Sequence, residues 1–256
     1  MNAVARQPTS VVFVEEYAAA ASRFSAAVAW SDMRAQVPSC PGWSTYDLVV
    51  HLGNVHAWAA TIVETRRRAV EQNDQPRSSR PRGVSEWYAG KAEDLYQVLR
   101  FVVPDQPCWN FVEHEGVAAF WARRQLHETT IHQVDLDAAC GRPTALQREV
   151  CADGVEEVLG TMLKRMHHRG FPAALDEPLA VVAADTGQRW VLTPQPIGPP
   201  ALSLPDKSTA KVRNRVEASV ATLYRLLWHR PVDRSAVSLS GDRDRVQAFL
   251  DSPLTP

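Results

Sequence analysis

The stretch of residues 121–139, WARRQLHETTIHQVDLDAA, constrains the fold of this chain more than any other segment. A helix turns by about 100° per residue, so side chains three and four residues apart share one face. That face contains Val117, Trp121, Arg124, Glu128, His132, Asp135 and Ala139. Such a mixture of apolar and ionisable side chains is not typical of a face turned to water. The sequence therefore predicts one long helix whose ionisable residues serve a purpose other than solvation.

Glu128 and His132 lie one helical turn apart, which allows both side chains to reach a single metal ion. The pair does not belong to the motif H-E-x-x-H, because His127 and His132 diverge by about 140° around the helix. A glutamate and a histidine at this spacing are also common on faces that bind nothing. A metal site therefore requires a third ligand from another part of the chain.

The composition limits the classes to which the protein can belong. Its 256 residues allow one large or two modest domains, and 45% hydrophobic with 22% charged residues is ordinary for a globular protein. The net charge of −1 gives no electrostatic reason to expect binding to nucleic acid or to an anionic membrane. No apolar run approaches the length of a membrane span or of a signal peptide core. The cysteines form no C-x-x-C pair, so we expect a reducing compartment and a cytoplasmic protein.

The first half of the chain predicts a four-helix bundle. The expected helices are residues 11–34, 45–72, 85–102 and 121–139. Ser44 and Asp47 have the spacing of a capping box at the start of the second helix. On that helix His51 shares a face with apolar residues and is expected to point towards the core. His56 lies off that face and is expected to be exposed.

From about residue 142 the pattern changes to a mixture of α and β. The expected elements are helices at 146–168, 219–228 and 243–250 and strands at 179–184, 189–193, 201–204, 211–216 and 237–240. The sequence Asp-Thr-Gly-Gln at 185–188 predicts a hairpin turn between the first two strands. We therefore expect an α+β protein, with a helical bundle over residues 1–142 and a smaller domain over residues 143–256. The smaller domain is expected to be an antiparallel sheet backed by helices.

His51 is the natural third ligand, because inward residues of different helices meet in the core of a bundle and metal sites are built there. Two histidines and one carboxylate form the catalytic type of zinc site, which leaves one position open. Asp135, one turn beyond His132, is placed to hold a ligand. Arg124, one turn before Glu128, either does the same, binds a substrate carboxylate or forms an ordinary ion pair.

The run VPSCPGWSTYDLVVHLGNVHAWA at residues 37–59 resembles the first signature of the mycothiol-dependent maleylpyruvate isomerase family, which belongs to the DinB-like metalloenzymes. The stretch 121–139 is similar to the second signature, an arginine-containing run followed by Glu, three residues, His, two residues and Asp. Residues 147–251 resemble the family's sterol-carrier-like domain, including RVEASVATLYRLLWHR. The candidate site residues are then the metal ligands His51, Glu128 and His132 and the catalytic residues Arg124, Asp135 and Arg230.

The sequence departs from the family pattern at two places. Gln133 and Val134 stand where family members usually have Arg-Trp after the second histidine, and His229 replaces the glycine before Arg230. Neither change affects a metal ligand, but both lie near where a substrate is expected to be held.

The resemblance implies a divalent metal, in the first place zinc, and mycothiol or a similar thiol as co-substrate. A metal lowers the pKa of a bound thiol from about 8.5, and the thiolate attacks an electrophilic small molecule. A cis–trans isomerase and an S-transferase share this step. Maleylpyruvate carries two carboxylates, for which Arg124, Arg189 and Arg230 are candidate partners, in a cleft expected between the two halves. A binding module with a structural metal and a hydrolase using metal-bound hydroxide stay open as alternatives.

Overall fold

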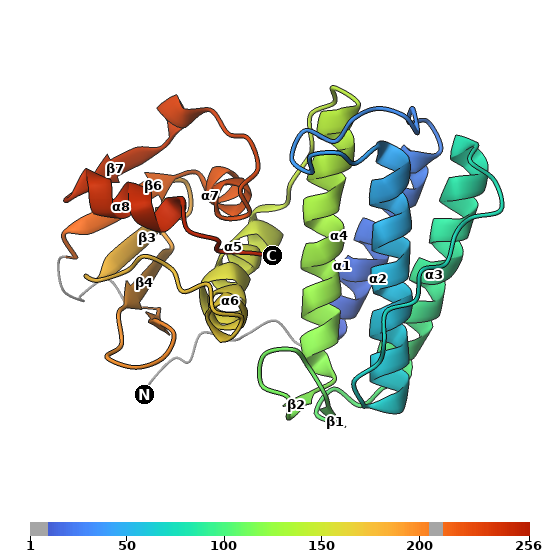
Figure 1. The fold of residues 1–256 in the computed structure, drawn as a ribbon, viewed down its shortest axis with the longest axis horizontal. Helices are drawn as coiled ribbons and strands as arrows, with labels where there is room; N and C mark the ends of the chain where they lie inside the picture. Colours follow the sequence, from blue (N-terminus) through green and yellow to red (C-terminus); the bar gives the residue numbers. More distant parts are fainter. Residues whose placement is uncertain (1–9, 205–211) are drawn as a thin grey trace. The chain divides into compact units, whose positions relative to one another are not determined.

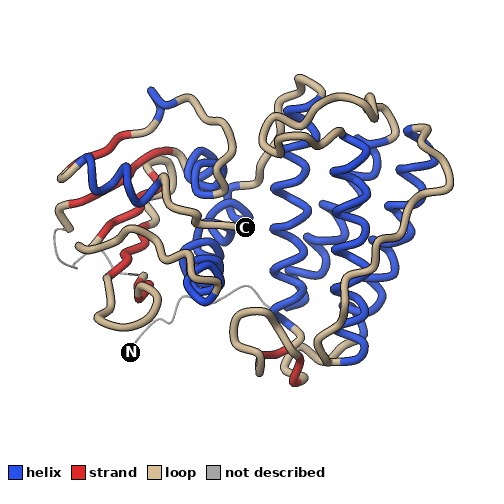
Figure 2. The backbone as a smooth tube through the Cα atoms, in the orientation of Figure 1, coloured by secondary structure: helices blue, strands red, loops and turns tan. Residues whose placement is uncertain are grey.

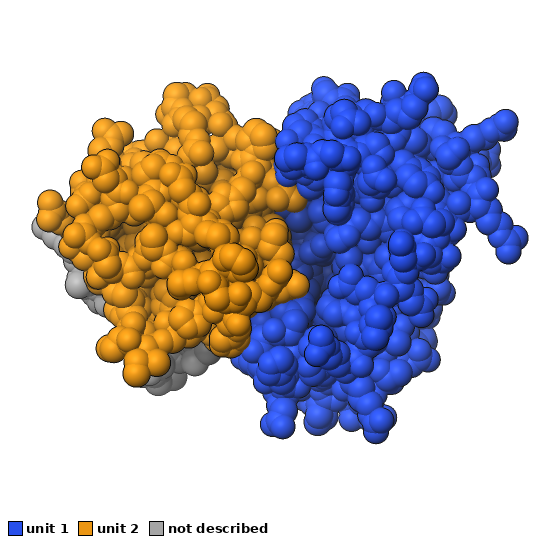
Figure 3. Space-filling view, in the orientation of Figure 1, with its two compact units in different colours: residues 1–144 blue, residues 145–256 orange. Residues whose placement is uncertain are grey.

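The chain divides into two compact units in its computed structural model, which describes residues 10–204 and 212–256. The division falls between Thr144 and Ala145, and Figure 3 colours the two units separately. Helices dominate the first unit, and the second combines helices with a five-stranded sheet, as Figure 2 shows. This confirms the expectation of a mixed helix-and-sheet chain. Within the described ranges, no helix combines the length and apolar character needed to cross a membrane.

The first unit contains four long helices, which lie side by side in Figure 1. They are α1 (Ser10–Val28), α2 (Thr45–Thr65), α3 (Pro81–Phe101) and α4 (Ala119–Ala139). Helices α1 and α2 each pack against both α3 and α4. Two short antiparallel strands, β1 (Pro107–Cys108) and β2 (Gly116–Val117), connect α3 to α4. Because α2 and α4 are neighbours, residues from the two sequence signatures can meet.

Local signals define the two ends of α2. The backbone N–H of Asp47 donates to Oγ of Ser44 at 3.3 Å, and the N–H of Ser44 donates to Oδ2 of Asp47 at 2.9 Å, which confirms the capping box. The helix ends at Thr65, earlier than the expected residue 72. Arg66 adopts a left-handed conformation with φ 63° while its N–H closes on the carbonyl of Ile62 at 2.6 Å. This change of hand terminates the helix.

Three other boundaries also differ from the expected ones. Helix α1 ends at Val28 rather than near residue 34. Just after this end, the hydroxyl of Ser31 donates to the carbonyl of Ala27, which favours a turn. Helix α3 begins at Pro81 rather than at residue 85, because a proline suits the first turn of a helix. Val117, expected on the face of α4, precedes that helix and lies in β2.

The core face of α2 corrects two expectations from the sequence. His56, expected to be exposed, is completely buried between α3 and α4. Its Nδ1 lies 2.7 Å from Oε1 of Gln125, and its Nε2 lies 3.1 Å from the hydroxyl of Tyr88. An amide oxygen only accepts hydrogen bonds, so Nδ1 carries a proton. Burial lowers the pKa of His56 from 6.5 to about 4, so the ring is neutral at neutral pH. His51, expected to point into the core, instead has a side chain that is 36% exposed.

The second unit begins with a continuous helical stretch, as expected from residues 146–168. It consists of α5 (Arg148–Glu157), the π-helical turn η1 (Val158–Met162) and α6 (Leu163–His168). The sheet has the strand order β5-β4-β3-β6-β7. Its strands are β3 (Leu179–Ala183), β4 (Arg189–Thr193), β5 (Ala201–Ser203), β6 (Asn214–Ala218) and β7 (Ser238–Ser240). The remaining helices are α7 (Val220–Leu227), η2 (Arg234–Ala236) and α8 (Arg243–Leu250).

The sheet is mixed, whereas the sequence predicted an antiparallel one. Strands β3 and β4 form the predicted hairpin, with Gly187 at φ 75° in the turn. Strand β6, however, lies on the other edge of β3 and pairs with it in parallel. Two parallel strands need a long crossover connection between them. The alternation of residues within a strand does not reveal such a connection, so the parallel pairing could not be predicted from it. The strand expected at 211–216 is observed at Asn214–Ala218, and Lys211 lies outside the described residues.

Candidate metal centre

Three potential metal ligands from two helices converge in the first unit. His51 lies on α2, and Glu128 and His132 lie one turn apart on α4. Nε2 of His132 is 3.3 Å from Oε1 of Glu128, and Nε2 of His51 is 3.7 Å from the same oxygen. One donor atom from each of the three residues lies within 4.8 Å of the other two. The fold thus brings together three side chains that the sequence singled out.

The spacing and chemistry of these donors fit a zinc ion. Ligand atoms that are about 2.0–2.2 Å from one tetrahedral zinc lie roughly 3.4 Å from each other. The distances from Glu128 to the two histidines, 3.3 and 3.7 Å, are close to that value. Two imidazole nitrogens and one carboxylate oxygen are the donor types of a catalytic zinc site. The residues present can therefore hold the metal that the resemblance of the sequence implies.

Arg124 orients the carboxylate of Glu128. Its Nη2 donates to Oε2 of Glu128 at 2.6 Å, which leaves Oε1 facing the two histidines. The Arg124 side chain is only 3% exposed. Burial by itself raises the pKa of the Glu128 carboxyl, but the Arg124 charge and hydrogen bonds from His132 and His51 hold that pKa well below its usual range. Glu128 is therefore a carboxylate, the form that binds a cation.

Asp135 orients His132 through the other ring nitrogen. Nδ1 of His132 donates to Oδ2 of Asp135 at 2.9 Å, and the hydroxyl of Ser39 donates to Oδ1 of the same carboxylate. Burial lowers the pKa of His132, but hydrogen bonds to Asp135 and Glu128 outweigh burial and raise that pKa to about 8. Once His132 is neutral, the proton on Nδ1 leaves Nε2 free to bind a metal.

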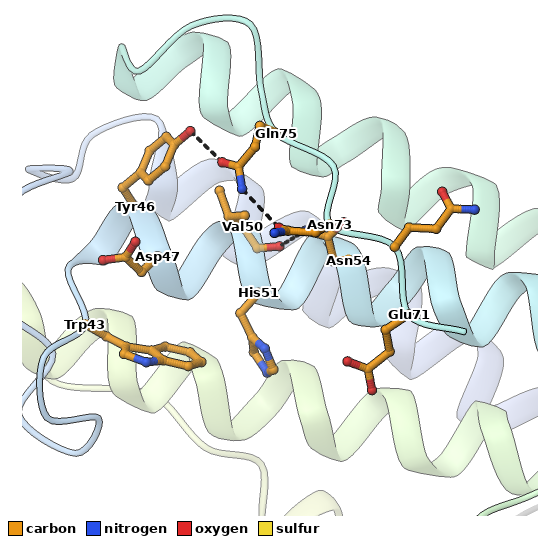
Figure 4. Close-up of a pocket in the computed structure, with 10 residues that line it drawn as sticks. Trp43, Tyr46, Asp47, Val50, His51, Asn54, Glu71, Asn73 and Gln75 are labelled. Atoms are coloured by element: carbon orange, nitrogen blue, oxygen red, sulfur yellow. Dashed lines mark hydrogen bonds between the residues drawn. The ribbon is translucent and has the colours of Figure 1, made fainter. Parts of the chain in front are cut away.

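His51 occupies the exposed side of the centre. Its ring lies 4.9 Å from the ring of Trp43 and 5.3 Å from the ring of His132, almost perpendicular to the latter at 85°. It also lines a pocket of about 440 Å³ on the surface of the first unit. Figure 4 shows His51 between Trp43 and Glu71, with the three side chains on the same side of α2. A ligand in this pocket therefore lies next to a candidate metal ligand.

Two candidate arginines lie in the second unit. Arg230 follows α7, and its Nη1 donates to the carbonyl of Trp228 at 2.7 Å. Arg189 is the first residue of β4 and alternates with the buried Trp190, so it lies on the opposite face of the sheet. The role of both arginines in binding a substrate stays a prediction.

Two residues of the centre were not singled out from the sequence. Ser39 and Trp43 belong to the proline-rich turn before α2, and they contact Asp135 and His51 respectively. The stiffness of that turn and its place directly before α2 were the available signal. Its contact with a helix 96 residues away depends on the packing of the unit and leaves no local pattern.

Two protein-family models match this sequence. The model described as the mycothiol maleylpyruvate isomerase N-terminal domain matches residues 14–137, and the model described as the MDMPI C-terminal domain matches residues 149–248. A search of curated proteins finds no match.

Solved structures share the fold over nearly the whole chain. The crystal structure of the mycothiol-dependent maleylpyruvate isomerase has a TM-score of 0.65 and covers 94% of this chain and 96% of its own, with 13% sequence identity. The crystal structure of a histidine-to-alanine mutant of that isomerase has a TM-score of 0.64, with the same coverage and identity. At this identity the likeness concerns the fold alone.

Proposed function

The chain belongs to the mycothiol-dependent maleylpyruvate isomerase family, and we propose that it is a thiol-dependent enzyme with a divalent metal ion, zinc in the first place. The metal is held by His51, Glu128 and His132. The thiol is mycothiol or a similar small thiol, and the second substrate is a small electrophile. The reaction is either cis–trans isomerisation or transfer of the thiol to the electrophile.

One observation carries this proposal: donor atoms of three side chains lie within 4.8 Å of one another. Structural zinc sites use four protein ligands, whereas three ligands leave a position for an external molecule. The exposed side of His51 at the edge of a pocket supports such an open position. A divalent metal bound there lowers the pKa of an incoming thiol from about 8.5 and so supplies a thiolate near neutral pH.

Two further residues orient the ligands. Asp135 accepts the hydrogen bond from Nδ1 of His132 and so directs Nε2 towards the metal position. Arg124 holds one oxygen of Glu128 and directs the other towards the histidines. We assign positioning roles to both residues, because the guanidinium of Arg124 is buried against Glu128 rather than presented to a substrate.

The two candidate reactions diverge once sulfur has added to an electron-poor carbon. In an isomerase, the new C–S bond converts the double bond into a single bond and moves its π pair towards the conjugated carbonyl. Rotation and loss of the thiolate then restore the double bond in the other geometry. In an S-transferase, a proton reaches the neighbouring carbon and the C–S bond persists. For a dicarboxylate substrate, we propose Arg189 and Arg230 as cationic partners.

The proposal extends to the architecture. We assign α1–α4 to a DinB-like four-helix bundle, in which adjacent helices supply metal ligands from their facing sides. We assign the second unit to a sterol-carrier-like domain, with the boundary near residue 142. The mixed sheet and its covering helices support that assignment at the level of fold class.

The test is turnover by the full-length protein loaded with zinc. The protein is incubated with a mycothiol-type thiol and maleylpyruvate, and chromatography with mass spectrometry separates an isomer of unchanged mass from an adduct. We expect product only when both zinc and thiol are present. His51→Ala and His132→Ala should lose both zinc and turnover, whereas His168→Ala, at an exposed histidine of α6, should lose neither. Turnover without thiol would indicate a hydrolase, and tight zinc without turnover of any thiol-accepting electrophile would indicate a binding module.

A further inference from the structure

The pocket beside His51 is lined by acidic and uncharged residues, which would not favour the binding of a dicarboxylate substrate. It is lined by Trp43, Tyr46, Asp47, Val50, His51, Asn54, Glu71, Gln72, Asn73 and Gln75. Asp47 and Glu71 are carboxylates, and several other lining residues are carboxamides. None of the described residues that line this pocket is a lysine or an arginine.

Two basic residues close to the pocket are paired with carboxylates. Lys91 approaches the same segment, but its Nζ lies 2.7 Å from a carboxylate oxygen of Asp74. Arg124 is buried and donates to Glu128. A carboxylate entering the pocket would therefore meet Asp47 and Glu71 without a cationic partner from its described lining. Like charges in this position repel, and the repulsion grows as the ligand excludes water.

Hydrogen bonds hold the wall of the pocket in place. The hydroxyl of Tyr46 donates to Oε1 of Gln75 at 3.0 Å, and Nε2 of Gln75 donates to Oδ1 of Asn73 at 3.1 Å, as drawn in Figure 4. Asn54 of α2 donates to the carbonyl of Asp74 at 3.0 Å and accepts from the N–H of Asp74 at 2.8 Å. The part of this segment at Asp74 and Gln75 is thus tied to α2 before a ligand arrives.

We propose that this pocket selects the thiol co-substrate by charge, receiving a polar group without negative charge and disfavouring an anionic one. Glu71 is the residue that sets the preference. It is exposed, lies beside His51 in Figure 4, and comes from the segment between α2 and α3. The carboxamides offer donors and acceptors to an uncharged polar group, and the Trp43 ring offers an apolar surface next to His51. This inference rests on the proposed function, because it assumes that the sulfur binds at the metal centre.

The test uses two thiols that differ in one group. N-acetylcysteine ends in a carboxylate, and N-acetylcysteinamide ends in an uncharged carboxamide. Calorimetry with the zinc-loaded, full-length protein measures the dissociation constant of each. We expect the amide to bind roughly tenfold more tightly than the acid at low ionic strength, and the ratio to fall when salt is added.

Charge reversal identifies the residue responsible. In Glu71→Lys we expect the ratio of the two dissociation constants to approach one or to invert. The matched control is Glu64→Lys, which makes the same change of net charge at an exposed glutamate near the end of α2 that does not line the pocket. Its ratio should equal that of the unmodified protein. Comparing ratios cancels any difference between the two thiols in acidity or in affinity for zinc itself.

The outcomes separate this inference from the function on which it rests. If both thiols bind but with equal affinity, or if Glu71→Lys and Glu64→Lys change the ratio alike, charge selection by this pocket is overturned and the thiol-dependent centre stands. If neither thiol binds to the zinc-loaded protein, the proposed function fails and the selection fails with it.

Discussion

Ser39 donates a hydrogen bond from its hydroxyl to a carboxylate oxygen of Asp135, which lies 96 residues further along the chain. The other oxygen of Asp135 accepts from His132, so the turn before α2 is connected through Asp135 to a candidate metal ligand. Asp135 is completely buried, which makes the loss of one of its partners costly. The proline-rich turn before α2 therefore helps to hold a histidine of α4.

The first prediction concerns this connection. We expect Ser39→Ala to weaken zinc binding by roughly threefold to tenfold, less than Asp135→Asn, for which about 10–100-fold is typical of residues that contact a ligand directly. Ser39→Thr keeps the hydroxyl and should retain most of the affinity. Competition with a chromophoric chelator measures the dissociation constants.

A control separates positioning from loss of stability. Ser44→Ala removes the N-cap of α2, which costs about 1 kcal/mol of stability, without touching Asp135. Equal losses of zinc affinity in Ser39→Ala and Ser44→Ala would show that Ser39 acts only through the stability of the turn.

The second prediction distinguishes the two roles considered for Arg124. If Arg124 orients Glu128, then Arg124→Gln should weaken zinc binding by about tenfold or more and leave the KM of the electrophilic substrate nearly unchanged at saturating zinc. Steady-state kinetics at several zinc concentrations, together with zinc titration, provide both values. A large rise in KM with unaltered zinc affinity would instead assign Arg124 to substrate binding.

The third prediction concerns the pH dependence of stability. Burial lowers the pKa of His56 to about 4 from an ordinary value of 6.5, despite a hydrogen bond to Gln125 that raises it. Between these values the unfolded chain binds a proton at this position and the folded chain does not. Stability that is present above pH 6.5 is therefore lost as the pH falls towards 4, by on the order of 3 kcal/mol in total.

Urea unfolding of the unmodified protein and of His56→Gln at several pH values measures this contribution. The variant should be less stable at neutral pH, because it repacks a buried site, but its stability should decline less steeply below pH 6.5. Parallel pH profiles in the two proteins would exclude His56 as the titrating group. Both proteins are measured without metal, so that the candidate metal ligands contribute equally to the pH dependence of stability in each.

The fourth prediction uses two glycines in helices as a matched pair. A Cβ at Gly53 of α2 would lie 2.4 Å from the ring of Trp87 on α3, whereas a Cβ at Gly90 of α3 would have nothing within 4 Å. Gly53→Ala should therefore cost about 1–3 kcal/mol through overpacking. Gly90→Ala should stabilise by up to about 1 kcal/mol, because alanine is the better helix former. Urea midpoints of the two variants should move in opposite directions, and a stabilising Gly53→Ala would contradict the close approach of α2 and α3.

Residues on one helix were the easiest part of the centre to predict. Glu128, His132, Asp135 and Arg124 are related by spacings of three and four, and the pitch of the helix alone places them on one side. For α2 the same reasoning predicted correctly that His51 meets residues of α4, but it did not predict which residues of α2 are buried. It assigned His51 to the core and His56 to the surface, and the structure has His56 buried and His51 half exposed at a pocket. The direction of the core cannot be read from α2 alone, since most of this helix is apolar.

In the sheet of the second unit, too, local features were predictable from the sequence and contacts between distant segments were not. The β3–β4 hairpin was predictable because its turn sequence is local, whereas the parallel pairing of β6 with β3 was not. The alternation of apolar and polar residues defines the two faces of a strand, but it does not define which strands pair with it.

The sequence by itself determined the elements with local causes: the capped start of α2, the glycine turn at 185–188, and the side of α4 on which four ionisable residues stand. Only the tertiary structure decided how far His51 is exposed, that Ser39 donates a hydrogen bond to Asp135, and that Asp47 and Glu71 line the same pocket. The physical reason is that hydrogen-bonding periodicity acts over a few residues, whereas the choice of packing partner depends on side chains that are distant in the chain and compete for the same buried surface.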